Sequence, residues 1–356
     1  MTSPRSSATK VAFNLQIIAI TLLLLYFGQA VLVPLAFAGL CTLLLLPIAV
    51  FFEHQGFPRL YAALISVILG VAFFTMTSYF ISSQIISFKN DMPLMAQRFT
   101  ELIHQLQTWV VAKFDLSSNN VQNFVDDTSS QILDNTSVLV STTFFTLSRI
   151  IFLMLIIPVY AFLILLYRHM IVKFVMALFS HNHSSLVKDI LFKTRAVVKG
   201  YIIGLFIETI LVAILLWIGF VLLGVKYAIL LALISALLKL VPYLGIVSAI
   251  VLSLSVTLTT NSMPTVTGVL IVQVVVHLID GNFLFPAIVG SKVKMNALAT
   301  IVGVIAGNLL WGIPGMFLAI PILATMKVIF DSLEPFKPWA ILLGDDPGVP
   351  KLKRSR

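Results

Sequence analysis

Long apolar runs without charged residues recur along this chain of 356 residues, and they constrain its fold more than any other feature. Apolar residues make up 59% of the sequence and charged residues only 10%. A soluble domain carries about 25% charged residues, and a run of about 20 apolar residues can cross a bilayer as a helix. The sequence therefore predicts an all-α, polytopic membrane protein whose first partner is the lipid bilayer.

The hydrophobic segments can be followed from one end of the chain to the other. Six are long enough to be full transmembrane helices: residues 11–27, 30–52, 60–88, 144–167, 201–223 and 264–285. Two further apolar segments, residues 227–258 and 296–330, are interrupted near the middle by proline and glycine. The sequence thus predicts six full spans and two broken segments.

The two broken segments decide the topology. Val241-Pro-Tyr-Leu-Gly245 divides the first and Gly312-Ile-Pro-Gly315 divides the second. Each half holds about 15 residues, or roughly 22 Å of helix, whereas the hydrocarbon core is about 30 Å thick. Each segment is therefore one long kinked span or a re-entrant hairpin. We favour hairpins, because broken helices that enter from opposite faces build the site of inverted-repeat transporters.

The distribution of charge predicts the orientation. Basic residues collect near the N-terminus, in residues 168–199, at Lys292 and Lys294, and in the C-terminal tail, whereas residues 89–142 are net acidic. Basic loops stay on the cytoplasmic side of a membrane. We therefore expect both termini in the cytoplasm and an amphipathic helical segment outside. The net charge of +9 is assigned to orientation and lipid headgroups, so no nucleic-acid partner is predicted.

These segments divide the chain into six consecutive regions. They are the first three transmembrane helices (1–88), the extracytoplasmic helical segment (89–142), one transmembrane helix (143–167), a basic interfacial helix and loop in the cytoplasm (168–199), a transport core with both broken hairpins (200–334) and a cytoplasmic tail (335–356). Small-residue motifs and the large apolar surface also lead us to expect a homo-oligomer.

Several kinds of function are disfavoured by what the sequence lacks. The single cysteine, Cys41, cannot form a disulfide framework or a Cys-based metal site within one chain. The sequence has no G-x-x-x-x-G-K-S/T motif for nucleotide-driven transport. It also has no H-E-x-x-H, G-x-S-x-G or paired-Asp protease signature. We therefore expect no enzyme activity, no cofactor and no metal site.

Four polar side chains interrupt apolar runs in the second half of the chain: Glu208, Lys239, His277 and Asp280. Polar groups at membrane depth are costly and usually functional. Burial favours the neutral forms of Asp280 and Lys239, so either could carry a proton near neutral pH. The alternatives are a structural ion pair between these two residues, or a Glu208 that pairs with Lys239 or faces water. His277 either shares a proton with Asp280 or hydrogen-bonds a neighbouring helix.

Three motifs follow one another in the second half of the chain. They are Leu240-Val-Pro-Tyr-Leu-Gly245, Asp280-Gly-Asn-Phe-Leu-Phe-Pro286-x-x-x-Gly290, and Gly312-Ile-Pro-Gly315 followed by Ala319-Ile-Pro321. With the spans and loops around them, they resemble the autoinducer-2 exporter family, also called the PerM-like permeases, over nearly the whole chain. Three positions differ from the family pattern: Lys239 stands where an acidic or neutral polar residue is common, Ala287 where a basic one is, and Ala297, after Asn296, where a proline is usual.

The resemblance implies a multi-pass protein of the bacterial cytoplasmic (inner) membrane. It implies export of a small signalling molecule such as autoinducer-2 in some members, and exchange of Na+ or Li+ for H+ in others. The pathway residues carried over by position are Pro242, Tyr243, Gly245, Asp280, Asn282, Pro286, Gly290, Gly312 and Gly315. The candidates added from the residues themselves are Glu208, Lys239, His277, Asn308 and Pro314.

We therefore expect a secondary transporter that moves a small solute by alternating access, either facilitated or coupled to an ion gradient of H+ or Na+. Three other interpretations stay open. They are an antiporter of Na+ or Li+ against H+, an oligomeric channel, and a membrane scaffold that transports no solute.

Overall fold

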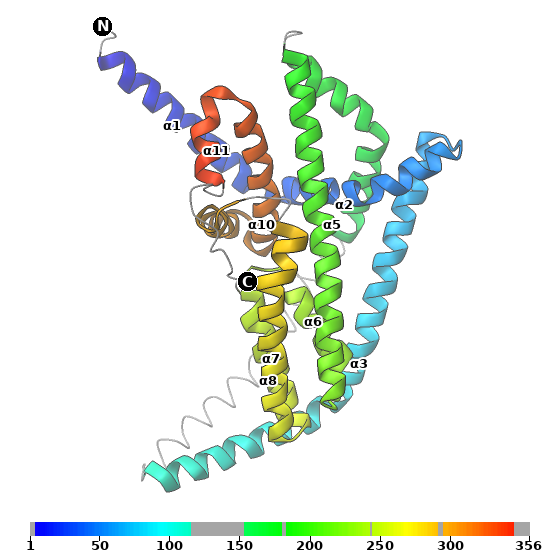
Figure 1. Cartoon of the computed structure of the whole chain (residues 1–356), viewed down its shortest axis with the longest axis vertical. Helices are drawn as coiled ribbons and strands as arrows, with labels where there is room; N and C mark the ends of the chain where they lie inside the picture. The colour runs from blue at the N-terminus through cyan, green and yellow to red at the C-terminus, as the bar shows by residue number, and fades with distance from the viewer. Residues whose placement is uncertain (1–3, 115–152, 180–182, 243, 291–294, 345–356) are drawn as a thin grey trace, which may run out of the picture. The chain divides into compact units, whose positions relative to one another are not determined.

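The structure of the chain is a computed structural model, and it describes residues 4–114, 153–179, 183–242, 244–290 and 295–344. Every named element within these ranges is helical, as Figure 1 shows. The strand-type pairing found there is an isolated bridge between Met295 and Gly344. The predicted all-α fold class is confirmed.

Six helices in the described part of the chain are long and apolar enough to cross a membrane. They are α2 (Gln29–His54), Arg59–Ile86 within α3, Leu153–Ala177, α5 (Ser184–Leu222), Met263–Gly290 and α10 (Ala297–Ser332). Shorter apolar helices are Ala12–Phe27, Ala228–Leu238 and Gly245–Thr260. The chain is thus a multi-pass membrane protein, as predicted. The first expected span, 11–27, lies in α1 (Pro4–Phe27), whose apolar part belongs to the shorter helices.

Two helices are longer than the sequence suggested. α3 (Arg59–Phe114) continues for 56 residues, through the third expected span and into the segment expected outside the membrane. α5 runs for 39 residues and joins part of the basic segment to the fifth span. Because α5 contains no proline, its backbone hydrogen bonds continue through the expected boundary at Gly200. Residues 115–152, which hold the rest of the segment expected outside, are not among the described residues.

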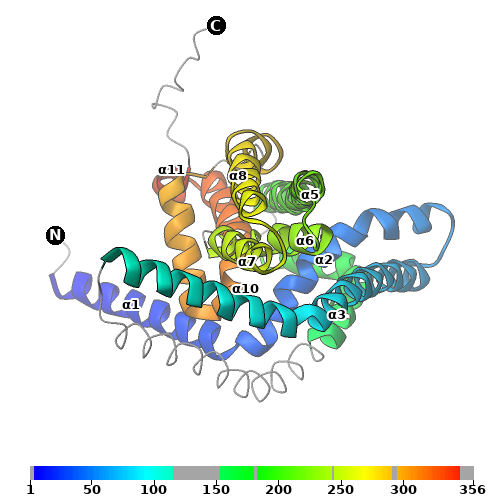
Figure 2. The same ribbon diagram turned by 90° about the horizontal axis from the view of Figure 1, so that it is seen from below.

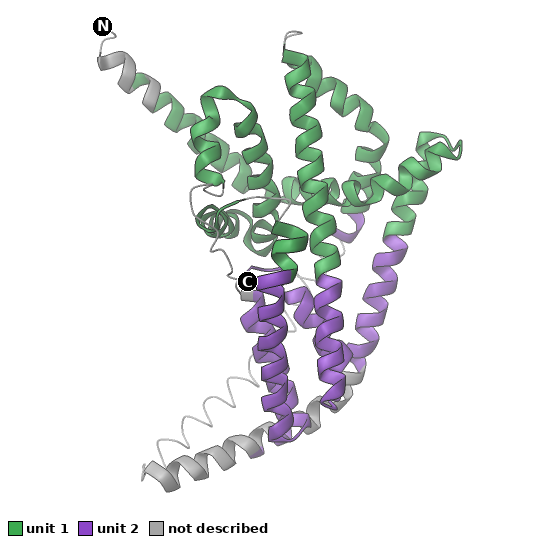
Figure 3. Cartoon of the chain, in the orientation of Figure 1, with its two compact units in different colours: residues 1–70, 157–208, 284–356 green, residues 71–156, 209–283 purple. Residues whose placement is uncertain are grey.

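The chain divides into two compact units, which Figure 3 colours separately. Unit 1 consists of residues 1–70, 157–208 and 284–356, and unit 2 consists of residues 71–156 and 209–283. Both α3 and α5 contribute residues to each unit. The expected transport core is therefore shared between the two units.

Unit 1 has a core of mostly small side chains. Its buried cluster consists of Ala38, Leu46, Ala49, Ala63, Val67, Ala161 and Leu165. Small side chains let helix backbones approach closely, which is how helices associate in a membrane. In the same unit, Phe37 of α2 stacks on Phe317 of α10 with 5.5 Å between ring centroids, and the Trp311 indole N–H donates to the Leu25 carbonyl at 2.8 Å. These contacts attach α10 to α1 and α2.

α10 is a helical hairpin rather than one straight helix. Gly312 has φ 64° and ψ −145°, a conformation that glycine adopts readily, and it separates residues 297–311 from residues 313–332. A Cβ atom on Gly303 would lie 2.1 Å from the Leu323 side chain. In a straight helix these two positions would be about 30 Å apart. The two arms therefore lie against each other, as can be followed in Figure 2.

Unit 2 is built around α6 (Ala228–Leu238), α7 (Leu244–Thr260) and α8 (Met263–Ile279), together with the last turns of α5. α5 and α8 lie close together, because a Cβ atom on Gly219 would meet the Val272 side chain at 2.5 Å. Unit 2 thus places a short helix pair beside two long helices.

The run from Asp280 to Gly290 corrects one expectation. The motif from Asp280 to Gly290, with its proline and glycines, predicts a break at the end of the span 264–285, but α8 continues as two π-helical segments, η2 (Asp280–Leu284) and η3 (Pro286–Gly290). A proline in an α-helix removes one backbone donor and clashes with the carbonyl four residues earlier. The wider π turn accommodates Pro286 without ending the helix. Single π turns inside α-helices are frequently found at functional sites.

Candidate substrate and ion site

A second helical hairpin, formed by α6 and α7, supplies one side of the candidate site. A Cβ atom on Gly245 would lie 1.8 Å from the Leu238 carbonyl oxygen, so only glycine lets α7 begin this close to the end of α6. Pro242 is half-buried in the turn, and Tyr243 lies outside the described residues. The segment 227–258 is therefore a hairpin in the structure and not one kinked helix.

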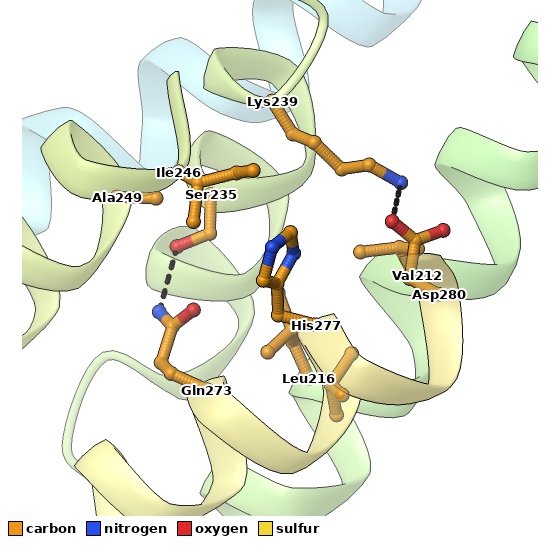
Figure 4. A pocket seen from close by; sticks show the side chains of 10 residues that line it. Val212, Leu216, Ser235, Lys239, Ile246, Ala249, Gln273, His277 and Asp280 are labelled. Atoms are coloured by element: carbon orange, nitrogen blue, oxygen red, sulfur yellow. Dashed lines mark hydrogen bonds and ion pairs between the residues drawn. The ribbon is translucent and has the colours of Figure 1, made fainter. Parts of the chain in front are cut away.

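A small cavity lies between this hairpin, α8 and the last turns of α5, and Figure 4 shows its lining. Its volume is about 20 Å³. That is enough for about one water molecule. The polar residues that line it are Ser235, Lys239, Gln273, His277 and Asp280. Two sequence candidates for proton transfer, and the histidine next to one of them, thus share one cavity.

Lys239 and Asp280 form a buried ion pair in the cavity wall. Lys239 Nζ lies 2.5 Å from Asp280 Oδ2, and the two side chains are 16% and 3% exposed. Lys239 caps the C-terminal end of α6, where the helix dipole favours a cation. Asp280 lies where α8 passes into the π-helical segment η2. The ion pair joins the end of α6 to this point of the long helix, and the structure thus has one of the pairings that the sequence left open.

The second carboxylate oxygen of Asp280 is buried without a partner. Oδ1 accepts no hydrogen bond from any residue in the described ranges. Leaving a buried polar atom unsatisfied costs about 1–3 kcal/mol, and more for a charged group. Unsatisfied buried groups in native proteins call for an explanation such as a bound ion, a water or a catalytic role. A proton, a cation or a donor group of a solute would each satisfy this oxygen.

A buried cluster of neutral polar side chains, of which Ser235 and Gln273 line the cavity, was not predicted from the sequence. Gln273 Nε2 donates to Ser253 Oγ at 2.9 Å and to Ser235 Oγ at 3.2 Å, and the two hydroxyl oxygens are 3.3 Å apart. All three side chains are buried. The cluster therefore ties both arms of the α6–α7 hairpin to α8.

The missed cluster has a signal in the sequence. Ser235 precedes Lys239 by four residues, and Gln273 precedes Asp280 by seven. These spacings put each polar residue on the same helix face as its charged neighbour. Two polar pairs on matching faces of two apolar helices indicate that those faces meet. In Figure 4 the His277 ring stands between the Ser235–Gln273 hydrogen bond and the Lys239–Asp280 pair.

The other predicted site residues are not in the lining of this cavity. Glu208 is 1% exposed and belongs to unit 1, so it does not face bulk water. Asn282 is exposed, and its amide donates to the Leu278 carbonyl at 2.9 Å. The remaining candidates also belong to unit 1: Pro286, Gly290, Asn308, Gly312, Pro314 and Gly315. Among the residues that the structure describes, no group of three His, Cys, Asp or Glu side chains could hold a metal ion.

The chain is similar to known membrane proteins over most of its length. The family model of the AI-2E family transporters matches residues 15–334. YueF of Bacillus subtilis (strain 168), named as a candidate transport protein, is 24% identical over 341 residues, which is 91% of this chain and 88% of that one. YhhT of Escherichia coli (strain K12), also named as a candidate transport protein, is 23% identical over 354 residues, or 99% of each chain. PerM of the same strain, named as a candidate permease, is 28% identical over 136 residues, or 38% of each chain.

Proposed function

Because the chain belongs to the AI-2E family of transporters, we propose that it is a secondary transporter that carries a small solute across the bacterial inner membrane by alternating access. The solute proposed first is a small signalling molecule that leaves the cell, and the coupling ion is H+ or Na+. We propose that the cavity in unit 2 is where the coupling ion binds.

One observation carries this proposal: the buried carboxylate of Asp280 is only half satisfied. One oxygen holds Lys239, and the other accepts no hydrogen bond within the described ranges. A purely structural ion pair would be expected to have all its hydrogen bonds made, because removing charges from water is otherwise too costly. An oxygen left open beside a water-sized cavity suits a site that a small ion occupies in another state of the cycle.

The ion pair also offers a way to convert ion binding into motion. Lys239 belongs to the α6–α7 hairpin and Asp280 to the helix that follows α8. A proton or cation on Asp280 cancels the charge that attracts Lys239, so the hairpin is held less strongly against α8. A ligand shifts a conformational equilibrium only through its different affinity for the two states. The different charge of Asp280 in the two states provides that difference.

In the proposed membrane arrangement both hairpins are re-entrant and enter from opposite faces, with both termini in the cytoplasm. The length of the arms of the α6–α7 hairpin supports this. α6 has 11 residues and α7 has 17. At 1.5 Å per residue these are about 16 Å and 25 Å, both shorter than a hydrocarbon core of about 30 Å. The turn of the α6–α7 hairpin would therefore lie inside the bilayer, at the depth where inverted-repeat transporters bind their substrates.

A second candidate function is exchange of Na+ or Li+ for H+ without an organic solute. The same open oxygen of Asp280 favours it, because a carboxylate is a ligand that a small hard cation prefers. Proteoliposomes distinguish the two functions. An antiporter moves protons in response to a Na+ gradient alone, whereas a solute transporter needs the solute on one side of the membrane.

The test is transport by purified protein in proteoliposomes with imposed pH or Na+ gradients. The wild type is compared with Asp280→Asn and Lys239→Ala. We expect both substitutions to abolish gradient-driven transport. The matched control is Asp189→Asn, which breaks the Lys193–Asp189 pair on α5, whose side chains are 56% and 48% exposed. We expect this control to transport like the wild type.

Two outcomes would overturn the proposal. Normal transport by Asp280→Asn with unchanged pH dependence would remove the coupling role of the carboxylate. Single-molecule currents through the reconstituted wild type would instead identify a channel, because ion flow through an open pore is far faster than a conformational cycle.

A further inference from the structure

The last described helix of the chain presents an apolar face. η4 (Glu334–Phe336) leads into α11 (Lys337–Leu343), which is the sequence KPWAILL. Trp339, Ile341 and Leu342 are 58%, 77% and 57% exposed, whereas Ala340 is only 4% exposed. The sequence predicts that these residues belong to a cytoplasmic tail. A solvated tail would not be expected to expose three large apolar side chains within four residues.

α11 is firmly attached to the start of the α10 hairpin through Asn296. The Asn296 side chain donates to the Leu342 carbonyl at 2.7 Å and to the Gly344 carbonyl at 2.9 Å. Its backbone N–H donates to Leu343 O at 3.1 Å, and its Oδ1 accepts from Ala299 N at 2.7 Å. One residue thus caps the end of α11 and the beginning of α10. The apolar face of α11 therefore has a fixed position in unit 1.

This attachment places α11 where the α10 hairpin begins and ends. Asn296 precedes the first arm, and the second arm ends at Ser332, five residues before α11 begins. Trp together with Lys or Arg is the residue combination typical of the membrane–water interface. Lys337 opens α11 and pairs with Glu334 at 2.6 Å, and the sequence beyond α11 contains Lys351, Lys353, Arg354 and Arg356. This composition therefore suits a membrane surface, in which negatively charged headgroups cover an apolar layer.

We propose that α11 is an interfacial anchor that inserts Trp339, Ile341 and Leu342 into the headgroup region of an anionic lipid leaflet. It thereby fixes the level at which the α10 hairpin enters the membrane. This anchoring rests on the proposed function in one respect, namely that the α10 hairpin is embedded in the bilayer. Such helices bury their apolar face about 5–10 Å into the boundary between headgroups and acyl chains.

A lipid surface fits this face better than a second protein copy does. A stable protein interface buries at least about 1,000 Å² and needs a complementary shape. The exposed apolar face of α11 consists of three side chains on a helix of seven residues. It is also continuous with a chain that already lies in lipid. A bilayer requires no shape match, and its negative charge complements the basic residues.

The anchor can be tested by spin labelling, because the chain has a single cysteine. In a Cys41→Ala background, Ile341→Cys carries a nitroxide on the apolar face, and Lys337→Cys carries one on a polar position of the same helix as the matched control. The full chain is reconstituted in vesicles of phosphatidylethanolamine and phosphatidylglycerol. The accessibility of each label to dissolved oxygen and to a water-soluble nickel complex then reports its depth.

We expect the label at 341 to be relaxed several-fold more by oxygen than by the nickel complex, and the label at 337 to show the reverse. If the nickel complex relaxes both labels equally, α11 is solvated and the anchor is refuted. If neither reagent reaches the label at 341, a protein surface covers it, which also refutes the lipid assignment. Gradient-driven transport is measured in the same vesicles, so loss of the proposed function is recorded separately from loss of the anchor.

A second variant guards against a folding defect in the cysteine-free background. Intrinsic fluorescence is measured for a chain that retains Trp339 while Trp109, Trp217 and Trp311 are changed to Phe. Lipids brominated near the headgroup are expected to quench Trp339 about twofold more than lipids brominated near the chain end, as the interfacial depth requires. Quenching by aqueous iodide alone would contradict the anchor.

Discussion

Each of the two helical hairpins of this chain has a glycine in close contact with its opposite arm, but the two carry different chemistry. A Cβ atom on Gly245 would lie 1.8 Å from a backbone carbonyl of the opposite arm, and one on Gly315 would lie 1.9 Å from the Gly307 carbonyl. The α6–α7 hairpin contributes Ser235, Ser253 and Lys239 to a polar contact with α8. The arms of α10 meet instead through glycine and apolar side chains. Glycine sets the shape of both hairpins, whereas the polar side chains on one of them make it a candidate site.

The largest effect is expected from removing one charge of the ion pair between the α6–α7 hairpin and Asp280. Asp280→Asn leaves Lys239 without its counter-ion in a site where its side chain is 16% exposed. Removing one partner of a buried ion pair costs about 3–5 kcal/mol. We expect a loss of this size in the free energy of unfolding, measured by denaturant titration in detergent.

A double substitution separates stability from transport. Adding Lys239→Met to Asp280→Asn removes the uncompensated charge, so most of the lost stability should return. Transport should stay absent, because the site has no carboxylate. Equal stability of the single and double variants would mean that the two charges are not energetically coupled.

The next effect tests what the two hairpins have in common. Gly245→Ala and Gly315→Ala each place a methyl group within 2 Å of a carbonyl oxygen of the opposite arm. Overpacking of this kind costs about 1–3 kcal/mol, and we expect values near the upper end for both. Thermal unfolding in detergent measures them. Gly281→Ala is the control, since a Cβ atom there meets nothing within 4 Å, and a control as unstable as the other two would remove the steric explanation.

A smaller effect tests the cluster that only the first hairpin has. Gln273→Leu removes two hydrogen bonds and leaves the hydroxyl groups of Ser235 and Ser253 buried. We expect a loss of about 2 kcal/mol in the free energy of unfolding. Adding Ser235→Ala and Ser253→Ala should restore part of it.

Transport by Gln273→Leu gives a second readout. If the cluster only holds the hairpin in place, the rate should fall by the same factor at every pH. A changed pH dependence would show that Gln273 also affects the group that takes up the proton.

The smallest effect concerns the attachment of the second hairpin. Trp311→Phe keeps the aromatic ring and removes the hydrogen bond to the Leu25 carbonyl. One such bond contributes about 1 kcal/mol, so the midpoint of unfolding should shift only slightly. Trp217→Phe, whose side chain is 43% exposed, is the control. If Trp311→Phe lost as much stability as Asp280→Asn, the two hairpins would not differ in the strength of their polar contacts.

Much of the fold could be predicted from the sequence, because membrane spans depend on the length and composition of single segments. Both hairpin turns could be located for the same reason, since Pro242, Gly245 and Gly312 act on the local backbone. The π-helical winding after Asp280 could not be predicted. It depends on which carbonyl accepts each N–H group, and a break and a π turn have the same residues.

The site could be predicted only in part. Lys239 and Asp280 stood out because a charge in an apolar run is rare, although several pairings were open. Gln273, Ser235 and Ser253 did not stand out, because neutral polar residues are common in apolar helices. Their role becomes visible once two helix faces are known to meet, which is information about pairs of segments rather than about one segment.

Asn296 caps both the end of α11 and the beginning of α10, and this has a consequence for the order in which the hairpin is completed during synthesis. The first residue of the α10 hairpin donates hydrogen bonds to carbonyl groups of residues 342–344. A chain emerges from the ribosome in sequence order, at about 5–20 residues per second. The first turn of α10 therefore leaves the ribosome several seconds before the residues that close the base of the hairpin. During that interval other groups have to satisfy the hydrogen-bonding atoms of the first turn of α10, and α11 completes the base of the hairpin rather than beginning it.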